Sequence, residues 1–197
     1  MVRHIGVFST TLLLALAISA QAKAQSIIKR PGDHPDYIFE AEPHLIVRDR
    51  RGHAGTGFGP GFRGTIVIVD NGFIGKINNS VGIGFGLDWL VFGDDHCHGP
   101  RRNPDFCHDH HQVITPVVLQ WNFWLHERWS VFGEPGFALV FNTDDDDELD
   151  GHDHHDGLDF DPFVFYAGGR FHFNETVALT MRLGFPLSAS IGCSFLL

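Results

Sequence analysis

An alternation of apolar residues with polar or small ones, repeated in eight segments of about ten residues, constrains this chain more than any other feature. Alternation with a period of two predicts β-strands that have one apolar face. The chain has 23 glycines and 19 phenylalanines but only two methionines, which favours strands and tight turns over helices. The predicted strands are Asp36–Arg48, Phe62–Phe73, Val81–Phe92, Val113–Leu125, Trp129–Phe141, Pro162–Phe173, Thr176–Phe185 and Leu187–Leu197.

The connections between these segments are predicted to be short at one end of the strands and long at the other. The short turns span residues 77–80, 126–128 and 174–175, and the long loops span residues 49–61, 93–112 and 142–161. Only Pro186 departs from this rule, because it leaves a very short connection where a long loop is expected. An even number of strands with this asymmetry is typical of outer-membrane barrels. The predicted fold is therefore all-β, an eight-stranded antiparallel up-and-down transmembrane β-barrel over residues 36–197.

The first 24 residues have the pattern of a secretory signal peptide. Arg3 precedes an apolar run over residues 10–20, and small residues around Lys23 provide a cleavage site. The apolar run is shorter than the roughly 20 residues that a transmembrane helix needs. We therefore expect residues 1–24 to be a signal peptide and residues 25–35 to form a periplasmic lead into the barrel.

The alternation also predicts the side of the barrel wall on which each side chain lies. Between Trp129 and Phe141 the odd positions are mostly large and apolar, whereas the even positions include Ser130, Glu134 and Gly136. Odd residues of this segment are therefore expected to face lipid and even residues the lumen. The thin polar face, with its glycines and few charges, indicates a narrow filled lumen rather than the solvent face of a soluble sandwich.

Aromatic residues are concentrated near both ends of the predicted strands. One group consists of Trp121, Phe123, Trp124 and Trp129, and the other of Trp89, Phe92, Phe141 and Phe163. Two such groups are typical of the aromatic girdles that mark the two membrane surfaces. The alternative is that these residues form the core of a soluble barrel.

Six charged residues are predicted to point into the lumen as an ion-pair network. They are Glu40, Glu42, Asp88, Glu134, Arg170 and Arg182. A narrow interior holds such charges only when they are paired and hydrogen-bonded, and Gly82, Gly84 and Gly86 leave room for arginines from neighbouring strands. We interpret the network as structural, with a gated pore or a proton path as the alternative.

Three segments carry a resemblance to a known class of proteins: Asn78–Trp89, Trp129–Phe141 and Tyr166–Leu197. With them, residues 36–197 resemble the small, eight-stranded, monomeric outer-membrane barrels, such as the transmembrane domain of outer membrane protein A and its short relatives. The resemblance implies a monomer in the bacterial outer membrane, surrounded by its lipid, inserted by the barrel-assembly machinery, with extracellular long loops and both termini periplasmic. Members of this class usually end on an aromatic residue, whereas this chain ends on Leu197.

Two of the predicted loops are rich in histidine and carboxylate. They contain eight of the 14 histidines, which are His96, His98, His108, His110, His111, His152, His154 and His155. Alternating imidazole and carboxylate groups are candidate ligands for Zn²⁺, Cu²⁺ or Ni²⁺. The carboxylates of the acidic run over residues 144–150 are candidate ligands for Ca²⁺ as well. An EF-hand register starting at Asp146 fails, because Gly157 stands where a bidentate glutamate is required. The alternative is a solvated low-complexity loop without a specific ligand.

The first of these loops also contains Cys97 and Cys107. The oxidising cell envelope favours a disulfide between them, and thiolate ligation of a metal together with neighbouring histidines is the alternative. Cys193 lies on the apolar face of the last predicted strand and is expected to act as a small hydrophobic residue.

The formal net charge of −10 argues against a nucleic-acid partner, which needs clustered cations. We expect a non-enzymatic outer-membrane barrel that presents acidic loops able to bind divalent metal ions, and no firm cofactor. One alternative is a soluble periplasmic barrel that carries a small apolar ligand. Another is a lipid-modifying outer-membrane enzyme that uses His44, His53 or a loop histidine, although no G-x-S-x-G motif is present. A passive pore is disfavoured, because eight strands leave little lumen.

Overall fold

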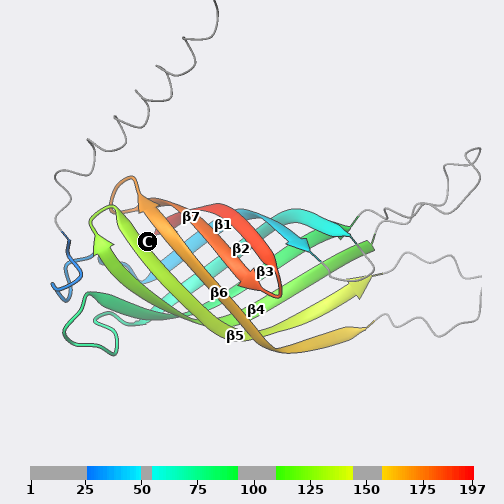
Figure 1. Cartoon of the computed structure of the whole chain (residues 1–197), viewed down its shortest axis with the longest axis horizontal. Coiled ribbons are helices and arrows are strands. Elements are labelled where there is room, and N and C mark those ends of the chain that lie inside the picture. Colours follow the sequence, from blue (N-terminus) through cyan, green and yellow to red (C-terminus); the bar gives the residue numbers. More distant parts are fainter. Residues whose placement is uncertain (1–25, 50–54, 93–109, 144–156) are drawn as a thin grey trace, which may run out of the picture.

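The chain folds into a closed barrel of eight antiparallel strands, which confirms the predicted fold class (Figure 1). The computed structural model describes residues 26–49, 55–92, 110–143 and 157–197. Each strand pairs with the next along the chain, and β1 closes the barrel by pairing with β8. The strands are β1 Phe39–Asp49, β2 Thr56–Val69, β3 Asn79–Phe92, β4 His110–His126, β5 Trp129–Thr143, β6 Leu158–His172, β7 Val177–Phe185 and β8 Ser188–Leu196.

The two ends of the barrel differ, and Figure 1 shows them at opposite sides of the view. At the turn end, short connections join β2 to β3, β4 to β5 and β6 to β7, and the first residues of β1 and the last residues of β8 lie there. At the loop end, β7 and β8 are joined by a tight turn around Pro186. None of the described residues belongs to a helix with the length and apolar character needed to cross a bilayer.

The predicted boundaries of the second strand were wrong at both ends. β2 begins at Thr56, inside the predicted loop 49–61, because Gly57, Gly59 and Gly61 belong to the strand rather than to a turn. A Cβ atom added to Gly57 would lie 2.5 Å from the Phe92 ring, so the strand needs glycine there for steric reasons. At its other end β2 stops at Val69.

The turn between β2 and β3 covers residues 70–78, so it is longer than the predicted turn over residues 77–80. Gly72, which follows Asn71, has a φ of 49°. That left-handed conformation is readily available to glycine, and it reverses the chain before Phe73, which the alternation alone had placed in a strand.

The other two predicted loops are also shorter than expected. β4 begins at His110, within the predicted loop 93–112, whereas β5 continues to Thr143 and β6 begins at Leu158, both within the predicted loop 142–161. Polar residues at the loop end of a strand still form backbone hydrogen bonds with the neighbouring strand. A strand end predicted from the type of side chain does not take this pairing into account.

The strands that form the barrel wall are shortest at β7 and β8, which have nine residues each, whereas β2 to β6 have 14 to 17 residues. On β6, Phe165 pairs with Phe185 of β7, and Leu158–Val164 continue beyond that point without a described strand on the β7 side. Arg48 of β1 lies 3.7 Å from Asp161 of β6, so an ion pair joins the two strands above the short hairpin.

The predicted assignment of side chains between Trp129 and Phe141 to the two faces is confirmed in β5. Odd residues of β4 and β5 are exposed or half-buried and even residues are mostly buried, and β7 and the part of β6 from Phe163 to His172 show the same pattern. Two aromatic residues of the predicted girdles lie inside instead. Trp124 is 1% exposed and Phe92 is fully buried, because both occupy even positions of strands whose even residues point inward.

Candidate functional site

Among the described residues, three arginines and four acidic residues are buried in the lumen, each of them 3% exposed or less. The six residues predicted for a lumen network all lie there, and the structure brings them together in two clusters and one neighbouring group. Arg63 of β2 is an additional member that was not predicted. Its inward direction follows from alternation with Phe62 within the predicted strand Phe62–Phe73.

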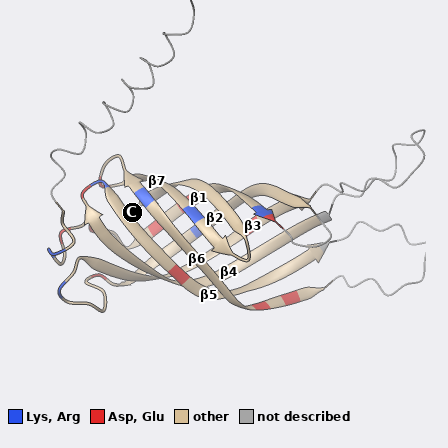
Figure 2. Ribbon diagram, viewed as in Figure 1, with Lys and Arg blue, Asp and Glu red and all other residues tan. Residues whose placement is uncertain are grey.

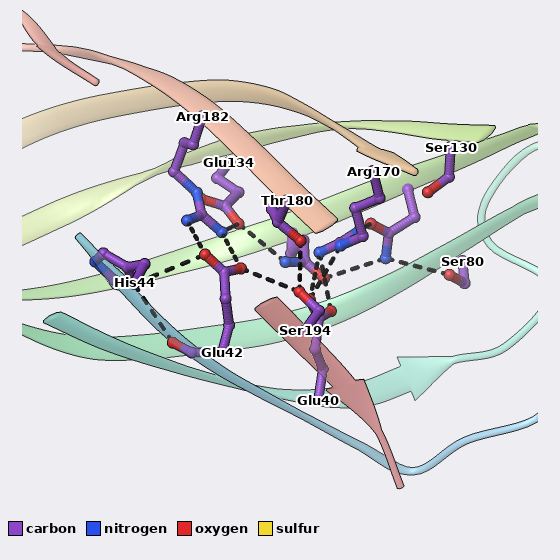
Figure 3. A network of polar contacts seen from close by, with 12 residues as sticks. Glu40, Glu42, His44, Ser80, Ser130, Glu134, Arg170, Thr180, Arg182 and Ser194 are labelled. Atoms are coloured by element: carbon purple, nitrogen blue, oxygen red, sulfur yellow. Dashed lines mark hydrogen bonds and ion pairs between the residues drawn. The ribbon is translucent and has the colours of Figure 1, made fainter. Parts of the chain in front are cut away.

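Glu40 and Arg170 form a bidentate pair near the turn end (Figure 3). The Nε and Nη2 atoms of Arg170 donate to Oε1 and Oε2 of Glu40 at 3.0 and 2.9 Å. The third guanidinium nitrogen, Nη1, donates to Oδ1 of Asn122 at 2.7 Å. All three nitrogens of this buried guanidinium therefore have acceptors, which the interior of a protein demands of a charged group.

Arg182 lies between two carboxylates and pairs with both. It donates to Glu42 at 2.7 and 2.9 Å, and to Glu134 at 3.0 and 3.3 Å. Gln120 donates to Glu134 at 2.9 Å, so that carboxylate has donors from two strands. This cluster ties β1, β4, β5 and β7 together across the lumen.

The ring of Phe132 lies between the two buried guanidinium groups. It is 4.2 Å from the guanidinium carbon of Arg170 and 5.1 Å from that of Arg182, both measured to the ring centroid. Cation–π contacts of this kind are strengthened where water is excluded. Gly168 makes the arrangement possible, because a Cβ atom there would lie 2.2 Å from the Phe132 ring.

Asp88 belongs to a neighbouring group further toward the loop end, together with Arg63 and His44. Nε2 of His44 lies 2.8 Å from Oδ1 of Asp88, and Arg63 lies 3.6 Å from Oδ2 of the same carboxylate. The guanidinium of Arg63 also lies over the Tyr166 ring, 5.1 Å from its centroid. Nδ1 of His44 is 3.7 Å from Glu42, which connects this group to the Arg182 cluster.

Apolar residues close the lumen on both sides of this polar zone. Toward the loop end lie Ile46, Leu90, Phe92, Ile114, Val118, Ala138, Val140, Val164 and Tyr166, all buried. Toward the turn end lie Ile27, Tyr37, Trp124 and Leu196. The charged groups are therefore enclosed between two apolar layers.

The turn-end layer depends on the segment over residues 26–38, which crosses the mouth of the barrel. Ile27 donates its backbone N–H to Leu125, and the side chain of Asn78 donates to the carbonyl of Asp33 at 2.7 Å. The ring of His34 stacks on Trp124 with centroids 5.2 Å apart. Burial raises the pKa of the Tyr37 hydroxyl in this layer. The predicted periplasmic lead thus forms a cap, in its described part, rather than a free tail.

Of the histidines considered for catalysis, His44 is buried against Asp88 inside the barrel. His53 and most of the loop histidines lie outside the described residues. A second buried contact joins Ser130 to Nε2 of His172 at 2.9 Å, but Nδ1 of His172 has no hydrogen-bond partner among the described groups. No carboxylate therefore orients that ring as it would in a catalytic triad.

Most of the predicted metal ligands and both loop cysteines lie outside the described residues. These are His96, His98, His108, His152, His154, His155, Cys97 and Cys107. His110 begins β4, and the ring of His111 lies 6.0 Å from that of Trp89. Within the described ranges no group of three or more metal-binding side chains occurs. Cys193 is a free, half-buried thiol on β8.

Comparison with known proteins identifies the fold but no relative by sequence. No protein-family model matches the chain, and no curated protein matches it. Ail, the attachment invasion locus protein of Yersinia pestis, solved in complex with the heparin analogue sucrose octasulfate, has 11% identical residues and a TM-score of 0.50, over 82% of this chain and 98% of Ail. Neisserial surface protein A has 13% identical residues and a TM-score of 0.46, over 82% of this chain and 96% of that protein.

At 11% identity the likeness to Ail concerns the fold alone. It supports the resemblance stated from the sequence at the level of the fold. The chain therefore has the closed eight-stranded antiparallel fold found in a small outer-membrane barrel.

Proposed function

We propose that this protein is a non-enzymatic outer-membrane barrel, sealed inside, that presents acidic, histidine-rich loops at the cell surface and binds divalent metal ions through them. The barrel would serve as a membrane anchor and the loops as the functional part. In this arrangement the turn end and both termini face the periplasm, and the signal over residues 1–24 directs export.

The observation that carries the membrane placement is the chemistry of the outer wall. Among the described residues, 32 large apolar side chains are exposed, and they include Phe85, Leu119 and Phe165 in the middle of strands. The outward positions of the strands hold no lysine, arginine or glutamate, and their one aspartate is Asp49 at the end of β1. In Figure 2 the strands are tan over most of their length. A soluble protein does not expose apolar surface on this scale.

Aromatic residues at both ends of the outer wall support the same placement. At the turn end the ring of Trp121 lies near those of Phe73 and Phe123, with centroids 5.8 and 5.1 Å away. At the loop end Phe137 lies 5.8 Å from Phe160. Aromatic side chains are enriched at the two interfaces of a membrane, with aliphatic residues between them, and this wall shows the same distribution.

The filled lumen supports an anchor rather than a pore or a ligand carrier. Ion-paired residues fill its middle, and the apolar layers that include Phe92 and Trp124 close it on either side. A carrier of a small apolar ligand needs an apolar cavity, whereas this interior is charged and occupied by its own side chains.

Heat-dependent gel mobility tests the barrel and its location together. The full chain, expressed in a Gram-negative host, is expected in the outer-membrane fraction and should run as a compact species in detergent until it is boiled, because a closed barrel keeps its hydrogen-bonded wall. Recovery in the soluble periplasmic fraction with unchanged mobility would contradict the proposal and favour the soluble carrier.

Calorimetric titration of the refolded barrel tests the metal proposal. Zn²⁺ is expected to bind, and replacing His152, His154 and His155 with asparagine should weaken binding severalfold, since imidazole nitrogen is a preferred zinc ligand. The control variant carries the same change to asparagine at His34, which stacks on Trp124 at the opposite end of the barrel. It should bind Zn²⁺ like the wild type. Equal binding by all three proteins would mean that these loop histidines are not the ligands.

A further inference from the structure

The ring of His34 joins the cap over residues 26–38 to the barrel beneath it. Its side chain is 2% exposed, and the ring lies at 15° to the indole of Trp124 in β4, with centroids 5.2 Å apart. Nε2 lies 3.1 Å from the backbone carbonyl oxygen of Asp70, in the turn between β2 and β3. Nδ1 lies 3.1 Å from the carbonyl oxygen of Pro35, within the cap. One ring therefore contacts the cap, the turn and β4 together.

Both ring nitrogens of His34 face oxygen atoms that can only accept a hydrogen bond. A neutral imidazole has one N–H group, so it donates to one of these carbonyls and directs a lone pair at the other. An imidazolium ring has two N–H groups and donates to both. The carboxylate of Asp70, 3.9 Å from Nε2, then lies next to a positive charge. Only the protonated ring satisfies all of these contacts.

The groups around His34 are mostly acidic. Carboxylates from the cap and from two turns line a hollow of about 270 Å³ beside the ring, and they are Asp33, Asp36, Glu127 and Glu175. No lysine or arginine is among the described residues that line this hollow. Arg30 of the cap pairs with Asp33 at 3.4 Å, and the ring of His172 in β6 lies 5.0 Å from the indole of Trp124. A positive charge on His34 therefore has acidic groups around it from the cap and from three turns.

We propose that His34 is a pH-sensitive latch, which in its protonated form holds the cap over the turn-end mouth of the barrel. The direction of the effect follows from the contacts. As the pH rises through the range of about 5–8 in which histidine titrates, the ring loses one of its two donated hydrogen bonds and its attraction to Asp70. The cap is then held by its remaining contacts and opens more often. This role goes beyond the proposed function, because it concerns the turn end and not the metal-binding loops.

Amide hydrogen exchange tests the latch, measured by NMR on the full chain refolded in detergent micelles at about pH 5 and about pH 8. Two amides report whether the cap is in place. Val67 donates its backbone N–H to Ile38 at 3.0 Å, and Asn78 donates to Ile28 at 2.7 Å. Each exchange rate is compared with that of an unstructured peptide at the same pH, which gives a protection factor. The amide of Phe132, in a strand that is paired on both sides, is the internal reference.

Two variants separate the latch from other histidines. His34→Asn removes the second donor, and His126→Asn is the matched control at the same end of the barrel. Nδ1 of His126 accepts the backbone N–H of Arg128, and an asparagine oxygen can accept it instead.

In the wild type and in His126→Asn, the amides of Val67 and Asn78 are expected to be protected several-fold more at about pH 5 than at about pH 8, whereas Phe132 is protected equally at both. In His34→Asn the protection of the two cap amides should be low and independent of pH. Equal protection of these amides at both pH values in the wild type would overturn the latch, and so would a pH difference that persists in His34→Asn. If His34→Asn does not fold, the nitrogen signals of the His34 ring in the wild type decide, because a ring that is neutral at about pH 5 contradicts the proposal.

Discussion

Arg182 illustrates how single residues stabilise this barrel from within. It is 3% exposed and shares its guanidinium between Glu42 and Glu134. Burying one charge without a partner costs several kcal/mol, whereas a fully paired group is tolerated. The lumen charges are therefore interdependent, and the loss of one member leaves the others in an unfavourable environment.

Replacing Arg182 with methionine is expected to destabilise the barrel by roughly 3–5 kcal/mol, because two carboxylates lose their main partner. Urea unfolding of the refolded protein measures this loss. Adding Glu42→Gln and Glu134→Gln should restore much of the stability, since the unpaired charges are then gone. Arg128→Met, in an exposed turn, is the control and should leave the stability nearly unchanged. If methionine were harmless at position 182, the ion pairs would not hold the lumen together.

Glycines inside the barrel are expected to behave differently from glycines on its outer wall. A Cβ atom on Gly61 would lie 2.3 Å from Nε2 of His44 and 2.4 Å from Oδ1 of Asp88, whereas one on Gly133 would find nothing closer than 3.9 Å. Gly61→Ala should therefore lower the unfolding free energy by about 1–3 kcal/mol, as overpacking does. Gly133→Ala should be neutral or slightly stabilising, since alanine costs less entropy in a strand. Equal effects in urea unfolding would contradict this steric explanation.

The direction of individual lumen residues can be predicted from alternation, but their partners cannot. Glu40 and Arg170 are 130 positions apart in sequence, and their contact depends on how β1 and β6 are placed across the closed barrel. The direction of Arg63 could also have been inferred, because it alternates with Phe62 within the predicted strand. The glycines before it were assigned to a loop, whereas Gly57 and Gly61 belong to the strand and make room for Phe92 and His44.

In the described part of the chain, β6 has a long edge without a paired strand. Its residues Leu158–Val164 extend beyond β7, and an exposed edge of this kind can pair with another chain. Asp159, Asp161 and Pro162 occupy this stretch. Charges and proline are the residues that natural sheets use to prevent edge-to-edge association. The outer part of β6 is therefore protected by its sequence.

Replacing both Asp159 and Pro162 with threonine is expected to promote self-association of the barrel in detergent, because the edge regains an N–H donor and loses a charge. Sedimentation velocity measures this, with the wild type expected as a monomer. Pro135→Thr is the control, since β5 has β4 and β6 on its two sides. A double variant that stays monomeric at the same concentration would show that these residues do not protect the edge.

The number and order of the elements could be predicted, whereas their ends could not. Each of the eight predicted segments overlaps one observed strand, because alternation reports the pleat directly. The ends depend on backbone pairing, as at β4 and β6, or on a turn signal such as Asn71-Gly72. The cap over residues 26–38 has no such pattern, and its contacts with Trp124 and Asn78 depend on the assembled mouth of the barrel.

At the scale of the whole molecule, the proposed barrel has a wall that separates a lipid-facing outside from a sealed inside. The arrangement reverses that of a soluble protein, with paired charges at the centre and apolar residues on the surface. Four consecutive positions of β4 sample both faces of this wall, because Val117 and Leu119 are exposed while Val118 and Gln120 are buried.

The most direct test is a nitroxide scan of positions 117 to 120, one label at a time, in the barrel reconstituted into phospholipid vesicles. Collisions with oxygen, which concentrates in lipid, are expected to be frequent at 117 and 119 and rare at 118 and 120. Collisions with a water-soluble nickel complex should be rare at all four positions. Frequent nickel collisions at 117 and 119 would place the outer wall in water and contradict the membrane placement.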